Sequence, residues 1–147
     1  FWLKTMAHAL LHLHSAWAVE QAVSGDDAKV VLLRFGHDYD PECLQVDSVL
    51  VDAAPTIRHV CNTFVVDTHD VPDFNQEYEL YDPCTLMFFF RGRHVQVDLG
   101  LGSQYKLTWP ITSSKELIDI VQAVHRGTQQ GKECITAMRD YALTLRY

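Results

Sequence analysis

The chain carries four cysteines, and one of them, Cys43, stands where the start of a helix could activate a thiol. The four thiols are widely and unequally spaced with no Cys-x-x-Cys pair, which argues against a zinc site. They are also too few for the disulfide scaffold of a small secreted protein. Dithiol exchange needs a second thiol three residues before Cys43, but that position is Asp40. A carboxylate cannot attack a disulfide, so Asp40 is favoured as the helix cap, and a reaction of Cys43 alone is the alternative.

Three early histidines are the next candidates for chemistry. His8 and His12 could share a helix face, with His14 nearby, as in a metal site. No acidic side chain or thiol lies close to them in the sequence. We therefore expect no metal site and no cofactor.

Acidic and basic side chains are distributed unevenly. Residues 38–82 hold eleven acidic side chains and one basic side chain, whereas residues 91–147 hold eight basic and five acidic side chains. Aromatic rings rimmed by carboxylates are typical of protein interfaces, although the same rings can instead be core residues. The candidate partner-binding residues of the acidic segment are Asp70, Asp73, Phe74, Tyr78 and Tyr81. The candidates for contact with RNA phosphates are Arg91, Arg93 and Lys106, whose charges would contribute modestly.

Length and composition limit the class of protein that positions these residues. A chain of 147 residues with 48% hydrophobic residues can build one domain around its own core. No apolar run is long enough to span a membrane, and the first residues lack the pattern of a signal peptide. The net charge of −7 argues against a general polyanion binder and favours a monomer when the protein is isolated. We therefore expect an intracellular compartment.

The first half of the chain has the pattern of a crossover unit, in which buried strands alternate with helices. Continuous apolar runs suit strands covered on both faces, and Asp followed by Pro is a strong helix start. The expected elements are a helix at 16–23 capped by Ser15, a strand at 29–36, a helix from Asp40 to Ala53 stopped by Pro55, and a strand at 62–67.

The second half has the pattern of a hairpin followed by a helix. The expected elements are apolar residues at helix-like spacing over 71–81, strands at 86–90 and 94–99 joined by a turn at 91–93 with Gly92 at positive φ, a loop at 100–110, and a helix that begins at the capping box of Ser113 and Glu116 and ends near Gly127. The order predicts an α/β fold with a mixed central sheet of about four strands flanked by helices. This is the topology that the thioredoxin fold requires.

Several long motifs resemble one known family. They are FGHDYDP at 35–41, VPDFN at 71–75, YELYDPCT at 78–85 and VDLG at 97–100. With these motifs the chain resembles the spliceosomal thioredoxin-like proteins of the U5 particle and the tri-snRNP, also called the Dim or Dib family. The likeness covers essentially the whole chain from Met6.

The resemblance implies a division of the chain. It places a thioredoxin-like domain at 6–128, a C-terminal extension at 129–147 that packs on the domain or on a partner, and a short extension at 1–5. Four residues of the C-terminal extension join the partner-binding candidates: Arg139, Tyr141, Arg146 and Tyr147.

The resemblance also implies a function. It indicates a nuclear, non-catalytic component of the spliceosomal tri-snRNP in pre-mRNA splicing. Members of this family contact the largest scaffold protein of the particle, with snRNA or pre-mRNA nearby, and leave when the spliceosome is activated. Binding the inactive assembly better than the active one would hold the pre-activation state. The alternative is a thiol–disulfide redox enzyme that uses Cys43 with Cys84.

Cys43 and Cys84 are therefore a candidate disulfide. In the thioredoxin fold the loop before the third strand packs against the helix start, which would bring the two thiols within reach. The resemblance supports this pairing, whereas the reducing nucleus argues against a persistent bond. Thr85 stands where thioredoxins keep a cis-proline that helps to bind substrate peptides, which is a second argument against thioredoxin-type catalysis.

Overall fold

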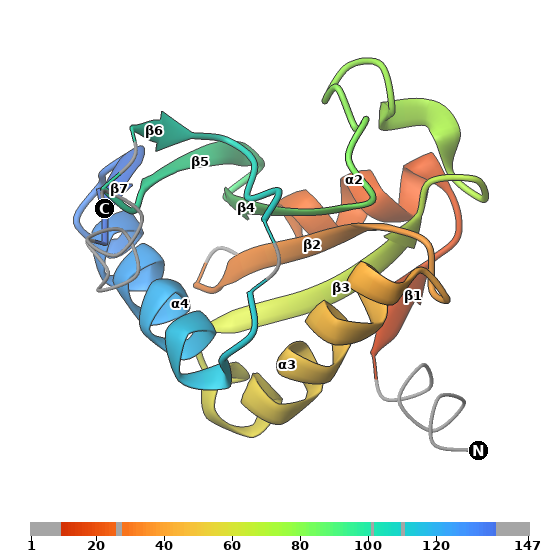
Figure 1. Cartoon of the computed structure of the whole chain (residues 1–147). Coiled ribbons are helices and arrows are strands. Elements are labelled where there is room, and N and C mark those ends of the chain that lie inside the picture. Colours follow the sequence, from red (N-terminus) through yellow and green to blue (C-terminus); the bar gives the residue numbers. More distant parts are fainter. Residues whose placement is uncertain (1–9, 26–27, 101, 110, 138–147) are drawn as a thin grey trace.

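The protein folds around one mixed β-sheet, as a computed structural model shows (Figure 1). The structure describes residues 10–25, 28–100, 102–109 and 111–137. The elements in this part of the chain are β1 (Leu11–Leu13), α2 (Ala16–Ser24), β2 (Val30–Gly36), α3 (Pro41–Ile57), β3 (Cys61–Asp67), the 3₁₀-helix η1 (Pro72–Phe74), β4 (Cys84–Phe90), β5 (Arg93–Asp98), β6 (Ser103–Gln104), α4 (Ser114–Gln129) and β7 (Cys134–Thr136). None of the described helices is long and apolar enough to cross a membrane.

The sheet combines a parallel half with an antiparallel half, as predicted. Its strand order is β1-β3-β2-β4-β5-β6, with β7 beside β5. Strands β1, β3 and β2 run parallel, and β4 and β5 are antiparallel to their neighbours. The four expected strands are present, and the described chain adds three short strands, β1, β6 and β7, to the expected number. These have two or three residues each, too few to show a periodicity in the sequence.

Helices cover both faces of the sheet (Figure 1). Helices α3 and α4 pack on one face and enclose the larger core, which includes Leu50, Phe88 and Val121. Helix α2 and the chain after β3 cover the other face, where Phe35 and Phe89 are buried. Strand β2 is buried along its whole length because it lies between β3 and β4 with a helical layer on each side.

The predicted helix starts are confirmed. Ser15 accepts a hydrogen bond from the Ala18 amide at the start of α2, and Ser113 accepts one from the Glu116 amide at the start of α4. The prediction that Pro55 stops α3 is wrong, because the helix continues to Ile57. Proline has a helical φ and removes only one hydrogen bond, a loss that the last turn of a helix tolerates.

The expected helix-like segment over 71–81 is not an α-helix. The described chain forms one short 3₁₀-helix and then turns, with hydrogen bonds from the Tyr78 amide to the Phe74 carbonyl and from the Leu80 amide to the Asn75 carbonyl. Glu79 has a φ of 53°, a left-handed conformation that prevents the turns from propagating as a helix. The apolar spacing therefore reflects successive turns that bury Val71 and Phe74, half-bury Tyr78 and leave Tyr81 exposed.

The hairpin between β4 and β5 forms as predicted. Arg91 has a φ of 52° and Gly92 a φ of 80°, and these two residues connect paired Phe90 and Arg93. Positive φ at both central positions is the geometry of the two-residue turns that match strand twist. The expected loop at 100–110 includes β6, and α4 ends at Gln129, two residues beyond the expected end.

Candidate functional site

Several side chains that could take part in catalysis or bind a metal ion lie at one end of the sheet, where β2 and β3 end. Gly36, the last residue of β2, lies opposite Asp67, the last residue of β3, and the Gly36 carbonyl accepts a hydrogen bond from the Thr68 amide at 3.0 Å. On its other side Gly36 lies opposite Cys84 of β4. Helix α3 begins five residues after Gly36, so its N-terminus lies over the same end of the sheet. In α/β sheets, ligands bind at this carboxyl end of parallel strands.

Asp40 caps the start of α3, three residues before Cys43, as predicted. Its Oδ1 atom accepts hydrogen bonds from the amides of Glu42 at 2.9 Å and Cys43 at 3.4 Å. Pro41 follows at the first helical position, where its missing N–H costs nothing. The carboxylate is therefore committed to the helix start.

Cys43 lies buried in the first turn of α3, beside Cys84. Its Sγ atom receives a hydrogen bond from the His37 amide at 3.4 Å and lies 3.3 Å from the Pro83 carbonyl oxygen, to which a protonated thiol would donate. The hydrogen bond that the Cys84 thiol donates lowers the pKa of Cys43, although burial opposes the shift, and Arg34 lowers it further. The same donation, together with burial, raises the pKa of Cys84. The hydrogen bond shows that the two thiols are in contact, as expected. Both cysteines are free in the structure, so the disulfide between them stays a prediction.

A buried ion-pair cluster, formed by Arg34, Asp38 and Asp47, lies beside the thiols. Arg34 has no exposed surface, and its Nε and Nη2 atoms donate to the two carboxylate oxygens of Asp47 at 2.9 and 2.8 Å. Nη2 also donates to Asp38 at 2.9 Å. Burial would lower the pKa of Arg34, but the two carboxylates more than offset it and the pKa is raised. The pKa of Asp47 is raised because burial outweighs its pairing with Arg34.

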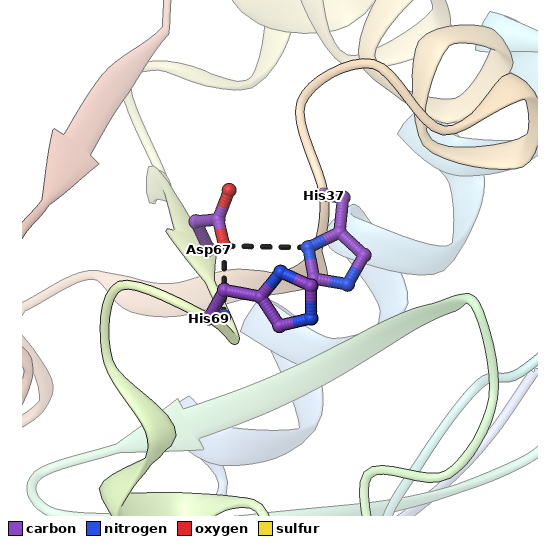
Figure 2. Close-up of side chains that lie close together, drawn as sticks. All are labelled: His37, Asp67 and His69. Atoms are coloured by element: carbon purple, nitrogen blue, oxygen red, sulfur yellow. Dashed lines mark hydrogen bonds and ion pairs between the residues drawn. The ribbon is translucent and has the colours of Figure 1, made fainter.

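Three side chains that the sequence analysis did not single out form a second group, the His–Asp cluster of His37, Asp67 and His69 (Figure 2). His37 Nδ1 lies 3.3 Å from Asp67 Oδ1, and the centroids of the two imidazole rings are 4.0 Å apart. Asp67 Oδ1 also accepts the amides of His69 at 2.8 Å and Asp70 at 3.3 Å. Burial alone would raise the pKa of Asp67, but these hydrogen bonds together lower it. The carboxylate is therefore ionised and held in place.

His12 and His14, the two early histidines that the structure describes, pair with carboxylates that adjoin the His–Asp cluster in the sequence. His12 belongs to β1, so the expectation of a helix face shared with His8 is wrong for His12, and His8 lies outside the described residues. His12 lies 3.5 Å from Asp38 and His14 lies 2.8 Å from Asp70. Acidic partners are thus near these histidines in space, although they are far from them in the sequence.

The aromatic candidates of the acidic segment divide by burial. Phe74 is 7% exposed and packs with Phe35 in the smaller core, and half-buried Tyr78 stacks on it, so these rings take the core role. Tyr81 is 79% exposed, and its role as a partner anchor stays a prediction. Asp73 is exposed, whereas exposed Asp70 pairs with His14.

One further exposed ring lies beside the helix start and was not predicted. Tyr39 is 71% exposed and lies between Asp38 and Asp40. A large ring between two polar residues in a loop that leads into a helix was the signal that could have identified it.

The basic candidates lie on the hairpin side of the molecule. Arg93 is exposed and pairs with Glu133 at 3.1 Å, and the Arg91 guanidinium lies 4.9 Å from the centre of the Phe90 ring. Lys106 donates to the Glu79 carbonyl at 2.9 Å. The four C-terminal candidates Arg139, Tyr141, Arg146 and Tyr147 lie outside the described residues.

The sequence matches known proteins along most of its length. Residues 9–141 match the model of a family described as Mitosis protein DIM1. Mitosis protein dim1 of Schizosaccharomyces pombe is 42% identical over 97% of this chain and 100% of its own length. Spliceosomal protein DIB1 of Eremothecium gossypii is 39% identical, over 90% of this chain and 92% of its own length. Thioredoxin-like protein 4B of Homo sapiens is 33% identical, over 92% of this chain and 91% of its own length.

Solved thioredoxin structures share the fold. Chloroplastic thioredoxin z aligns with a TM-score of 0.64 at 15% identity, covering 80% of this chain and 96% of its own. A mutant thioredoxin from Halobacterium salinarum aligns with a TM-score of 0.63 at 17% identity, covering 78% and 89%. The predicted thioredoxin-like fold is confirmed, and at this identity the likeness shows the fold alone.

Proposed function

This chain belongs to the Mitosis protein DIM1 family, and on that premise we propose that it is a non-catalytic component of the spliceosome in pre-mRNA splicing. The match of residues 9–141, with relatives named as spliceosomal proteins, carries the proposal. Within the spliceosome the protein joins the tri-snRNP in the nucleus. There it contacts the largest scaffold protein and holds the assembly before activation, with RNA nearby.

The geometry of the thiol site supports a role without catalysis. Cys43 has no exposed surface, and Asp40, three residues before it, caps the helix. A thiol that exchanges disulfides must reach its substrate, and a second thiol must resolve the mixed disulfide. An interaction role instead uses the exposed surface, where Tyr39 and Tyr81 offer the large rings that protein interfaces favour.

Recovery of the assembly from nuclear extract tests this function. The full chain should retain tri-snRNP proteins at low salt, and splicing complexes stalled before activation should contain it while activated complexes should not. Tyr81→Ala should lower the recovery, because the loss of an exposed anchor at an interface costs about 2 kcal/mol or more. Tyr105→Ala, which removes another exposed ring from the β5–β6 side, is the matched control. Recovery of no spliceosomal protein by the wild-type chain would reject the proposal.

The redox enzyme is the second candidate, and the lowered pKa of Cys43 favours it. Insulin reduction with dithiothreitol decides between the two candidates. We expect no acceleration by the protein. Clear turnover that Cys43→Ser abolishes would reverse the ranking.

A further inference from the structure

The end of the sheet holds a group of metal-ligand side chains that the proposed function does not use. His37, Asp67 and His69 each offer one ligand atom, and these three atoms lie within 4.8 Å of one another. They come from two adjacent loops, since His37 directly follows β2 while Asp67 ends β3 and His69 lies in the turn after it (Figure 2).

One pair of these ligand atoms already has the spacing of zinc ligands, and all three lie within 4.8 Å of one another, so small side-chain rotations would bring them onto one ion. Zinc binds imidazole nitrogen and carboxylate oxygen at about 2.0–2.2 Å, which places neighbouring ligands of a tetrahedral site about 3.3–3.5 Å apart. The separation of 3.3 Å between His37 Nδ1 and Asp67 Oδ1 is close to that edge and longer than most N–H···O hydrogen bonds. The centroids of the His37 and His69 rings are 4.0 Å apart, and one nitrogen of each ring belongs to the three ligand atoms that lie within 4.8 Å of one another.

The cluster is also held in position before any ion arrives. The bond between the Thr68 amide and the Gly36 carbonyl fixes one loop against the other. The amides of His69 and Asp70 fix the Asp67 carboxylate. Neighbouring polar groups that orient a ligand in this way raise metal affinity about 10–100-fold.

We propose that His37, Asp67 and His69 bind one divalent transition-metal ion of the zinc class, with a fourth coordination position open to solvent. Two imidazoles and one carboxylate form a donor set that suits zinc and leaves a position for water or for a ligand from a partner. The open position follows from the exposure of His69 at the rim of the site. The ion would join the loop that leads into α3 to the turn after β3. This inference stands independently of the proposed function.

Titration of the full, tag-free chain with Zn²⁺ and with Co²⁺ tests the site, with thiols kept reduced. Calorimetry should show one saturable site, and the visible absorption of bound Co²⁺ should report a coordination number below six. His69→Ala should lower the affinity by at least about 100-fold, because the loss of an outer-shell partner alone costs about 10–100-fold. Asp67→Asn, which keeps an oxygen for the backbone amides, should have a comparable effect.

Two matched controls locate the ion. His59→Ala removes an exposed histidine that precedes β3, at the opposite end of this strand, and should bind Zn²⁺ as the wild type does. Cys134→Ser removes the exposed thiol and should also leave binding unchanged. The proposal is overturned if the wild type shows no saturable site, if His69→Ala binds as the wild type does, or if Cys134→Ser abolishes binding.

Discussion

Two groups of titratable side chains lie at the same end of the sheet and differ in burial. The buried ion-pair cluster encloses Arg34, which has no exposed surface, between two carboxylates. The side chains of His37 and Asp67 in the His–Asp cluster are 37% and 31% exposed, and His69 is exposed. The buried side chains can therefore act only through the stability of the fold, whereas the partly exposed side chains are accessible to a ligand.

The thiol pair belongs with the buried ion-pair cluster in this comparison. The hydrogen bond from Cys84, and then the charge of Arg34, lower the pKa of Cys43, which would favour reactivity. The sulfur is nevertheless covered by the Pro83 carbonyl and by the start of α3. A thiol without access to a substrate is not a catalyst, whatever the direction of its pKa shift. We therefore expect the arrangement around Cys43 to act through stability rather than through catalysis.

The largest effect should come from breaking the buried ion pair. Arg34→Met leaves the buried carboxylate of Asp47 without its cation, which should lower the free energy of unfolding by about 3–5 kcal/mol. Chemical denaturation of the wild type and the variant measures this change. The double variant Arg34→Met with Asp47→Leu should recover much of the loss, because an apolar pair of similar volume carries no desolvation penalty. A single variant as stable as the wild type would show that the ion pair is dispensable.

A side chain added at Gly36, where β2 approaches the Cys43 sulfur, should have the next largest effect on stability. A Cβ atom added at Gly36 would overlap Cys43 Sγ and approach the Pro83 carbonyl oxygen to 2.8 Å, so Gly36→Ala should cost about 1–3 kcal/mol in thermal or chemical unfolding. Adding Cys43→Ala should restore part of this loss.

Gly127→Ala is the matched control for this prediction. The added Cβ would meet the flexible end of the Ile135 side chain, which can move, and alanine favours the helix. This variant should lose less stability than Gly36→Ala. Equal losses in both would contradict a close approach specific to the thiol site.

Loss of the Asp40 cap should have a smaller effect on stability but should change access to the thiol. Asp40→Ala removes the acceptor for two amides and should cost about 0.5–2 kcal/mol, while Asp40→Ser should restore most of it. Fraying of the first turn should also increase the rate at which a thiol reagent modifies Cys43, measured in a Cys134→Ser background. Ser113→Ala removes the cap of α4 at a comparable cost and should leave that rate unchanged. If both cap variants react alike, Asp40 does not protect the thiol.

Local patterns were sufficient to predict the main elements of the fold. The caps Ser15, Asp40 and Ser113 lie next to the helices that they start, and the buried strands are continuous apolar runs. The apolar spacing over 71–81 predicts a helix, but the turns that bury Val71 and Phe74 produce the same spacing as one helix face. Distinguishing them required the left-handed φ of Glu79, which no apolar pattern encodes.

The two halves of the candidate site differed in how far they could be predicted. Asp40 and Cys43 lie on one helix start, so their relation is local and visible in the sequence. His37 and Asp67 are 30 residues apart and meet only because β2 pairs with β3 in a register that places Gly36 opposite Asp67. Polar residues directly after two adjacent parallel strands were the available signal, and the register was the missing information.

The smallest expected effect is the contribution of Asp67, in the His–Asp cluster, to the pH dependence of the folding stability. Its pKa is lower in the folded protein than the ordinary value of about 3.9, so the ionised carboxylate stabilises the fold above that pH, and this contribution is lost as the pH falls through the folded pKa. Asp67→Asn carries no such charge, so its stability should fall less steeply than that of the wild type in acid unfolding below pH of about 4. Asp67→Ala should share the flatter profile and lose further stability at neutral pH, because it also removes the acceptor for the amides of His69 and Asp70. An acid profile of Asp67→Asn as steep as that of the wild type would mean that the carboxylate gains nothing from its amides. A difference in stability between variants of the buried ion-pair cluster and variants of the half-buried His–Asp cluster would then need a cause other than the burial of the charges.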